Sequence, residues 1–232
     1  MDYQAISEAF QKGLVYLPVT LRLSFIPLLI GSILGLGFAF MRFYRTPVVA
    51  KGLQLIFPIL KGIPVVLSLI VCYLLFSDWF DQLATTFHFP IRFKDLNREY
   101  LIIVILSGYA TIQLTEVFRG LLIQFDRSQL DAAASIGLTT RQTIFRIILP
   151  QLLTQSLPLL CNQWIVLLKL SALASIVSVV DILSGSLIMA TTSYTFLESY
   201  IAAALIYWIL AIMIEQMGFF LERRPFVKRG GV

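Results

Sequence analysis

The sequence predicts an all-α membrane protein with five transmembrane helices and a short cytoplasmic helix between the third and the fourth. Only 13% of the 232 residues are charged and 58% are hydrophobic, whereas a soluble domain typically carries about 25% charged residues. The apolar residues also form long blocks, since no charged residue lies between Arg22 and Arg42 or between Arg146 and Lys169. Such blocks are long enough to cross a bilayer, which takes about 20 residues of helix.

The whole chain, residues 1–232, is expected to form one transmembrane domain. The predicted spans cover about residues 18–41, 54–76, 100–118, 158–180 and 199–220. The apolar stretch 147–180 would form a helix of about 50 Å, which is too long for a hydrocarbon core of about 30 Å. Residues 147–157 are therefore predicted to lie at the interface. Residues 182–197 are rich in Ser, Thr and Gly and are predicted to be interfacial or re-entrant, with a six-span count as the alternative.

Basic residues indicate the orientation, because cytoplasmic loops are enriched in Lys and Arg. These residues gather between the first two spans, in the polar loop 119–146 and after the fifth span, and none lies between the fourth and the fifth. The loop 78–99, with three basic residues, is the exception. The pattern places the N-terminus outside and the C-terminus in the cytoplasm. It also accounts for the net charge of +5 without a nucleic-acid partner.

The loop 119–146 contains the main functional signal. Asp131-Ala132-Ala133-Ala134-Ser135-Ile136-Gly137 predicts a short helix that ends at the glycine, a usual helix terminator. Asp126 or Ser128 can cap its start. The alanines give the helix a slim face that can lie in a groove of another protein, although an ordinary connecting helix would fit these residues equally well.

This stretch resembles the cytoplasmic loop of ABC importer permeases, whose signature is an acidic residue, two alanines, a glycine three residues on and a later Leu-Pro, here Leu149-Pro150. Over nearly the whole chain the sequence is similar to the polar amino acid (histidine/glutamine-type) permeases. The further matching positions are Thr20-Leu21, Ser24, Gly31, Gly35, Lys61-Gly62-Ile63-Pro64, Gly108-Tyr109, Glu116-Val117-Phe118-Arg119-Gly120, Ser128-Gln129, Gln151, Pro158, Asn162, Leu168-Lys169 and Leu221-Glu222-Arg223-Arg224.

The sequence departs from the family pattern at two places. Asp131 stands where the family usually has Glu. Lys169-Leu170-Ser171-Ala172-Leu173 stands where the family has Lys-Asp-Thr-Ser-Leu, so an acidic residue beside the lysine is lost. The second departure bears on the substrate path.

The resemblance implies the ABC type I importer permease fold in a prokaryotic plasma (inner) membrane. It implies three protein partners: a cytoplasmic ABC ATPase dimer, a second permease chain (in a homodimer or heterodimer) and an extracytoplasmic substrate-binding protein. Membrane lipid would surround the permease. The chain contains no G-x-x-x-x-G-K-[ST] phosphate loop, so ATP and Mg are expected to bind to the partner ATPase. This chain is expected to bind no cofactor and to have no enzymatic activity. The residues expected to couple to the ATPase are Gln129, Asp131, Ala132, Ala133, Ala134, Gly137 and Leu138.

Polar residues within the spans are candidates for the substrate path or a gate. A charged side chain at mid-bilayer costs roughly 2.5–3.5 kcal/mol on insertion scales, so Lys169 is expected to contact substrate, to pair with Glu116 or Asp181, or to snorkel to an interface. Asn162 lies two helical turns before it. Lys61-Gly62 and Pro64 interrupt the second span as a simple kink or as a gate. The candidate residues are Lys61, Gly62, Pro64, Glu116, Asn162 and Lys169.

Two other classes of protein were considered. A self-contained secondary transporter or channel would need no ATPase, but the chain lacks the internal repeat of many secondary transporters. A membrane enzyme is disfavoured because no nucleophile–base pair is evident. A metal site is not predicted, because His88 is the only histidine and Cys72 and Cys161 lie far apart.

Overall fold

The computed structural model describes residues 2–44 and 47–222, and the regular structure in these ranges is helical. The basic residues counted above include five that lie outside the described ranges: Arg45 between the first two spans, and Arg223, Arg224, Lys228 and Arg229 after the fifth. Five helical segments are long and apolar enough to cross a membrane, as the sequence predicted. They are Leu17–Phe43, Val65–Thr86, Glu99–Gln124, Thr140–Val177 and Phe196–Glu222.

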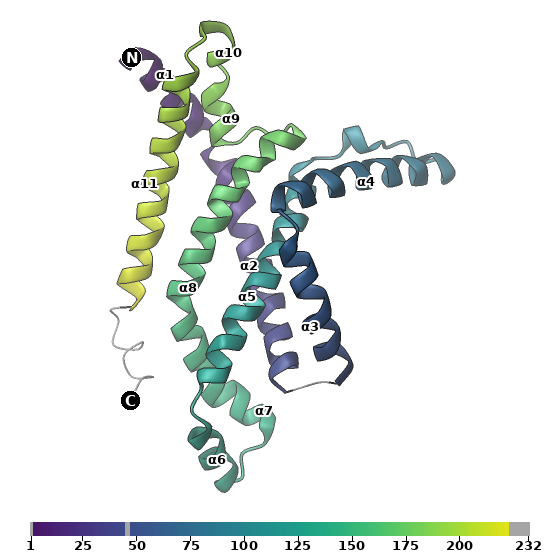
Figure 1. The fold of residues 1–232 in the computed structure, drawn as a ribbon, viewed down its shortest axis with the longest axis vertical. Coiled ribbons are helices and arrows are strands. Elements are labelled where there is room, and N and C mark those ends of the chain that lie inside the picture. The colour runs from purple at the N-terminus through teal and green to yellow at the C-terminus, as the bar shows by residue number, and fades with distance from the viewer. Residues whose placement is uncertain (1, 45–46, 223–232) are drawn as a thin grey trace.

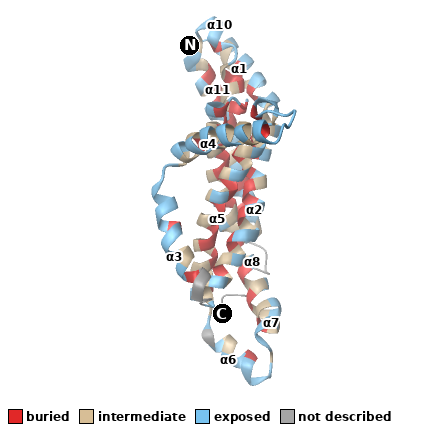
Figure 2. Cartoon of the chain, turned by 90° about the vertical axis from the view of Figure 1, so that its right-hand side faces the viewer, coloured by how far each residue is buried: buried red, intermediate tan, exposed pale blue. Residues whose placement is uncertain are grey.

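Four long helices run along the length of the molecule (Figure 1). They are α2 (Leu17–Phe43), α5 (Glu99–Gln124), α8 (Leu149–Leu170) and α11 (Phe196–Glu222). The most extensive helix pair is α2 with α5, and the buried residues follow these helices through the molecule (Figure 2). Leu23, Leu106, Leu114 and Phe118 are at most 1% exposed and form the centre of the core.

Glycines on α2 allow its close approach to α5. A Cβ on Gly31 would lie 2.5 Å from the Cβ of Ala110, and a Cβ on Gly35 would lie 3.0 Å from the backbone nitrogen of Thr115. Gly37, in contrast, has open space around it. Small residues allow helix backbones to approach closely in lipid, where there is no hydrophobic drive to bring helices together. Gly31 and Gly35 therefore set the α2–α5 distance, and Gly37 does not.

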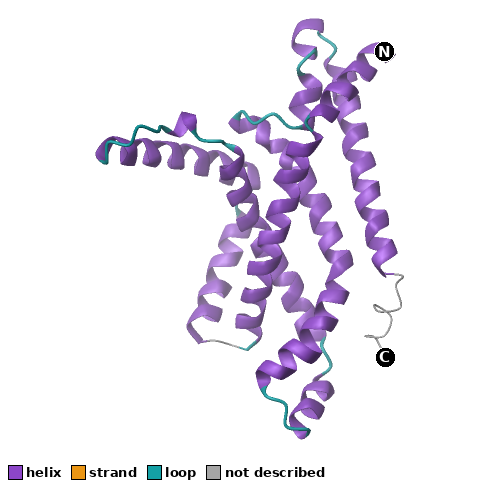
Figure 3. Ribbon diagram, turned by 180° about the vertical axis from the view of Figure 1, so that it is seen from behind, coloured by secondary structure: helices purple, strands orange, loops and turns teal. Residues whose placement is uncertain are grey.

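The second predicted span is divided between two helices. α3 (Pro47–Gly62) runs back along α2. α4 (Val65–Thr86) then turns sideways and projects away from the bundle (Figures 1 and 3). The break falls at Pro64, whose ψ of 134° is extended, because proline lacks an N–H and disfavours a helical residue before it. The expected span 54–76 thus straddles a bend rather than forming one rod. A short 3₁₀ turn, η1 (Phe93–Asp95), lies in the connection to α5.

The chain from α6 to the end of α8 is also more continuous than expected. After α6 (Arg127–Ser135), the chain forms α7 (Thr140–Thr143), a π-helical turn at Ile144–Ile148, α8 and a 3₁₀ turn at Ser171–Val177. Residues 147–157 are continuous with one helical segment of 38 residues, Thr140–Val177, so the predicted interfacial stretch and the predicted fourth span belong to one helical run. Pro150 falls in the first turn of α8, where its missing N–H removes no intrahelical bond.

Three short helices close the end of the molecule opposite α6. α1 (Tyr3–Val15) packs against α11 and α9 (Ile182–Leu187), and α10 (Ala190–Ser193) follows. The last two have 6 and 4 residues and are too short to cross a bilayer, so the six-span alternative does not hold. Asp181 is fully buried here: its Oδ1 accepts from the backbone N of Ser184 at 3.0 Å, and its Oδ2 accepts from the Tyr207 hydroxyl at 2.8 Å.

The glycine contacts give a testable prediction for stability. Gly31→Val is expected to destabilise the protein by about 1–3 kcal/mol or more, because the added side chain would overlap the α5 backbone. Thermal unfolding in detergent would measure the change. Gly37→Val is the matched control, on the same helix with no atom near the added Cβ. Equal melting temperatures for the two variants would contradict the close packing.

Candidate functional site

The predicted coupling helix is α6, which lies at the extreme end of the molecule (Figure 1). Its N-cap is Asp126, which accepts hydrogen bonds from the backbone N of Ser128 at 2.9 Å and from the Ser128 hydroxyl at 2.6 Å. Both hydrogen bonds favour the ionised carboxylate, and they hold the pKa of Asp126 below its usual value. Of the two caps considered from the sequence, Asp126 is the one used.

The C-terminal end of α6 has the predicted glycine stop. Gly137 has a φ of +78°, in the left-handed region that glycine adopts without strain. The backbone N of Leu138 donates to the Ala133 carbonyl at 3.0 Å, and the N of Gly137 donates to the Ala134 carbonyl at 3.0 Å. These two bonds form a Schellman-type helix end, so α6 is a short rod with both termini fixed.

The seven residues predicted to couple to an ATPase do not share one face of this rod. Asp131, Ala132 and Ala134 are exposed, and Ser128 and Ser135 extend the exposed face at helical spacing. The opposite face is attached to the bundle: Ala133 is 2% exposed, and Gln129 accepts a hydrogen bond from Gln151 of α8 at 2.9 Å. Gly137 lies at the exposed end of the rod, and Leu138 is half-buried.

Glu116 lies in an ion network between α2 and α5. It pairs with Arg42 of α2, and its other carboxylate oxygen lies 3.4 Å from the Nε of Arg119. The Arg42 side chain is only 8% exposed and that of Glu116 is 33% exposed, so the pair is partly shielded from water and ties the two helices together. The sequence marked Glu116 as a polar group in a span, but Arg42, at the end of the first apolar block, was missed as its partner.

Asn162 and Lys169 both lie on the exposed side of α8. Among the described residues Lys169 has no ion pair, so the expected alternatives of Glu116 and Asp181 as partners are not realised: Glu116 pairs with arginines and Asp181 bonds to Tyr207. Lys61, Gly62 and Pro64 are exposed at the bend between α3 and α4. The path candidates therefore occupy at least two separate places in this chain.

A groove between α8 and α11 brings Asn162 beside two acidic residues. Its volume is about 180 Å³, and Glu215 and Glu222 line it together with Cys161 and Gly218. Both carboxylates were missed from the sequence. Glu215 is a charge inside the fifth apolar block, which is the same signal that drew attention to Lys169.

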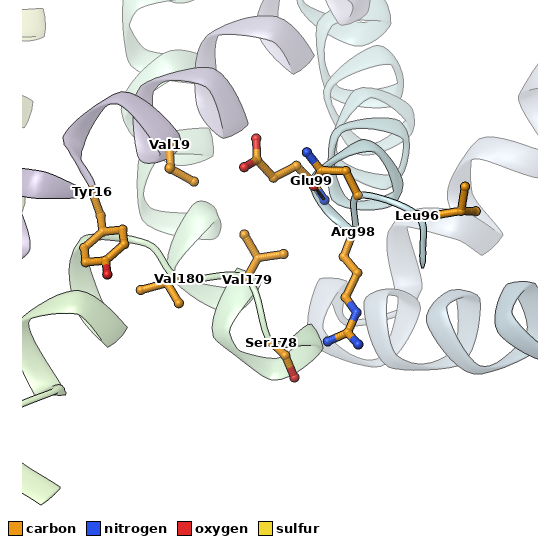
Figure 4. A pocket seen from close by; sticks show the side chains of 9 residues that line it. Tyr16, Val19, Leu96, Arg98, Glu99, Ser178, Val179 and Val180 are labelled. Atoms are coloured by element: carbon orange, nitrogen blue, oxygen red, sulfur yellow. Dashed lines mark hydrogen bonds between the residues drawn. The ribbon is translucent and has the colours of Figure 1, made fainter. Parts of the chain in front are cut away.

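An open pocket of about 400 Å³ lies near the first residues of α2 and α5, and Figure 4 shows it from close by. Three distant segments form it, and beside it Arg22 forms an ion pair with Glu99 at 3.2 Å. In Figure 4 the Glu99 side chain extends toward Val19, whereas Arg98 extends toward the Ser178 turn. Nothing in the sequence links these segments, so the pocket could not be predicted. Its lining residues are Tyr16, Val19, Leu96, Asn97, Arg98, Glu99, Ser178, Val179 and Val180.

A third cavity, of about 580 Å³, opens where α4 leaves the bundle. Its wall is almost entirely apolar, with Val71 of α4 facing Val104 and Ile112 of α5 across it. No group of three or more His, Cys, Asp or Glu that could hold a metal ion occurs within residues 2–44 and 47–222.

Comparisons with known proteins identify the class. Residues 20–227 match the family described as "Binding-protein-dependent transport system inner membrane component". The chain is 30% identical to the L-cystine transport system permease protein TcyL of Bacillus subtilis over 92% of this chain and 87% of that one. It is 28% identical to the probable amino-acid ABC transporter permease protein PatM of Vibrio harveyi over 96% of each chain.

Solved structures share the fold. A structure described as an amino acid ABC transporter with histidines superposes with a TM-score of 0.79 at 24% identity, covering 97% of this chain and 99% of that one. The MetNI methionine ABC transporter in an inward-facing conformation gives a TM-score of 0.68 at 15% identity, with full coverage of both chains. The similarity extends over the whole permease chain and is not limited to a few motifs.

The chain therefore belongs to the family of inner membrane components of binding-protein-dependent transport systems. It is a multi-pass permease subunit of an ABC importer with the type I permease fold. The self-contained transporter or channel considered from the sequence is set aside, and the protein is a transport subunit.

The left-handed turn after α6 yields a prediction. Gly137→Val is expected to weaken ATPase docking several-fold while membrane insertion stays intact, because a β-branched residue at this φ costs about 1–2 kcal/mol. Pull-down of the ATPase subunit from detergent extracts would measure it. Gly137→Asn is the control, since Asn tolerates the left-handed region. Normal pull-down by the Val variant would show that the turn is not needed for docking.

Proposed function

We propose that this permease imports a polar amino acid, together with a cytoplasmic ABC ATPase dimer, a second permease chain and an extracytoplasmic substrate-binding protein. The amino acid class is supported by the relatives, which include permeases described for amino acids, L-cystine and arginine. The observation that carries the assembly is the free face of α6, which is short, capped at both ends and exposed at the end of the molecule.

The exposed face of α6 suits a protein groove. Ser128, Asp131, Ala132 and Ser135 have small side chains and no apolar bulk, so a partner can approach the helix closely. The attached face keeps the helix fixed on the bundle during that contact. ATP and Mg would bind to the ATPase subunits, whereas this chain would bind no cofactor and contribute the docking helix.

A second permease chain, a copy or a related protein, is supported by α4. This helix projects from the bundle and has only Leu69 and Ala84 buried along its length. Leu67, Val71 and Leu75 are at least half exposed, and the apolar cavity at its base faces the same region. An apolar arm of this kind can pack against another chain, with lipid covering the remainder.

The proposed orientation places the N-terminus outside and the C-terminus in the cytoplasm. The distribution of basic residues in the loops supports it. The arrangement of helices is consistent with it, because α6 and the last described turn of α11 lie toward one end of the molecule, and α1 lies at the other (Figure 1). The pocket at Arg98 and Glu99 would then open on the side from which substrate arrives.

Within the proposed path, the candidate residues take different roles. Asn162 and Lys169 share the exposed side of α8 and would line the route between the two permease chains. The bend at Lys61, Gly62 and Pro64 would act as a hinge for a gate, because the chain there is exposed and not helical at Pro64. Glu116, engaged by Arg42 and Arg119, would hold helices together and not touch substrate.

Co-expression of this permease with a candidate ABC ATPase and a candidate substrate-binding protein from the same organism tests the assembly. Two copies of the permease are co-expressed, each with a different tag. Pull-down through one tag is expected to recover the ATPase and a second permease chain, which is either the copy with the other tag or a related protein. In proteoliposomes the complex should take up labelled amino acids only with ATP and the binding protein. ATP-independent uptake by the permease alone would contradict the proposal.

Lys169 tests the proposed path. Lys169→Met is expected to reduce amino acid uptake by about tenfold or more while ATPase binding is unchanged, because the exposed side of α8 would lose its cation beside Asn162. Lys94→Met, at an exposed position in η1, is the matched control and should transport normally. Near-normal uptake by the Lys169 variant would remove this residue from the path.

A further inference from the structure

The attached face of α6 contains one hydrogen bond that links the coupling helix to a membrane-spanning helix. The side-chain amide of Gln151 on α8 donates to Oε1 of Gln129 on α6 at 2.9 Å, and the bond is partly buried. Among the described residues it is the only side-chain hydrogen bond seen between α6 and α8. Leu130 and Ala133 add apolar contact on the same face.

The covalent connection between the two helices is longer and contains several irregular steps. From α6 the chain passes through the left-handed turn at Gly137, the four residues of α7 and the π-helical turn at Ile144–Ile148 before it reaches α8. π-helical turns inside α-helices are often found at functional sites. Gln151 follows this turn by three residues. The Gln129–Gln151 bond therefore bypasses the irregular connection and joins α6 directly to the regular part of α8.

Movement delivered to α8 at Gln151 has a continuous route to the other end of the molecule. α8 continues to Leu170 and then through the 3₁₀ turn to Ser178, whose left-handed φ of 61° turns the chain. Val179 and Val180 follow directly and line the pocket at the outer end. One helical segment thus connects the coupling helix to the opposite face of the bundle.

We propose that the Gln129–Gln151 bond is a strut that transmits movement of the docked coupling helix to α8. The two glutamines are positioning residues. They do not contact the ATPase, and they couple the movement of α6 to α8, which lines the proposed transport path. This inference rests on the proposed docking of an ATPase on the exposed face of α6. That face lies opposite the strut, so docking and transmission can be separated by experiment.

The chemistry of the amide gives a distinctive mutational pattern. Each glutamine has both a donor and an acceptor, whereas an ionised glutamate has acceptors only. Gln129→Leu and Gln151→Leu each remove the bond. Gln129→Glu and Gln151→Glu each keep it, because the remaining glutamine can donate to the carboxylate. The double variant Gln129→Glu/Gln151→Glu has no donor and places two negative charges together, so it loses the bond.

The test uses the full complex with its ATPase and substrate-binding protein in proteoliposomes. For each variant, ATPase pull-down, ATP hydrolysis and uptake of labelled amino acid are measured together. The two Leu variants and the double Glu variant are expected to bind the ATPase normally and to hydrolyse ATP, with transport per ATP reduced about fivefold or more. The two single Glu variants should stay within about twofold of the unmodified protein. Gln124→Leu, at an exposed position at the end of α5, is the matched control.

Three results would overturn the strut. Unchanged transport per ATP in both Leu variants would show that the bond transmits nothing. If the double Glu variant transported as much amino acid per ATP as the single Glu variants, the hydrogen bond would not be needed for transmission. Loss of ATPase binding in the Leu variants would make the glutamines docking contacts instead. If the unmodified permease does not bind the ATPase at all, the proposed assembly fails and the strut fails with it.

Discussion

The close contact of α2 with α5 is the constraint on which the rest of the structure depends. In lipid, helices associate through packing and not through a hydrophobic drive, so the approach of Gly31 to Ala110 and of Gly35 to Thr115 sets the centre of the bundle. The pair of Arg42 with Glu116 ties the same two helices near one end. Because α5 leads directly to α6, this contact also fixes where the coupling helix is presented.

The two faces of α6 differ in their packing. One face, with Gln129 and Ala133, packs against the bundle, and the other, with Asp131 and Ala132, is exposed and is the proposed docking face. The helix is rigid because Asp126 fixes its start and the Gly137 turn fixes its end. The proposed docking on one side of α6 and the bond to α8 on the other would together let a movement of the ATPase reach the bundle.

The bend at Pro64 leaves one helix of the chain, α4, without packing partners among the described residues along most of its length. It directs α4 away from the bundle, leaves most of that helix uncovered and opens an apolar cavity beside α5. At the end of the molecule opposite α6, in contrast, polar contacts hold the short helices, with Asp181 bonded to Ser184 and Tyr207 in the interior. The molecule therefore combines a well-packed bundle with a projecting arm suited to a second chain.

The sequence alone determined the membrane class, the number of apolar segments long enough to span and the glycine stop of α6. These features depend on composition, run length and local backbone preference, as in the glycine stop at Gly137 and the proline break at Pro64. Only the tertiary structure decided the direction of α4, the pairing of Arg42 with Glu116, the pocket at Arg98 and Glu99, and the bond from Gln129 to Gln151. Each of these requires segments distant in sequence to meet, and no local pattern encodes which side chains then come within hydrogen-bonding distance.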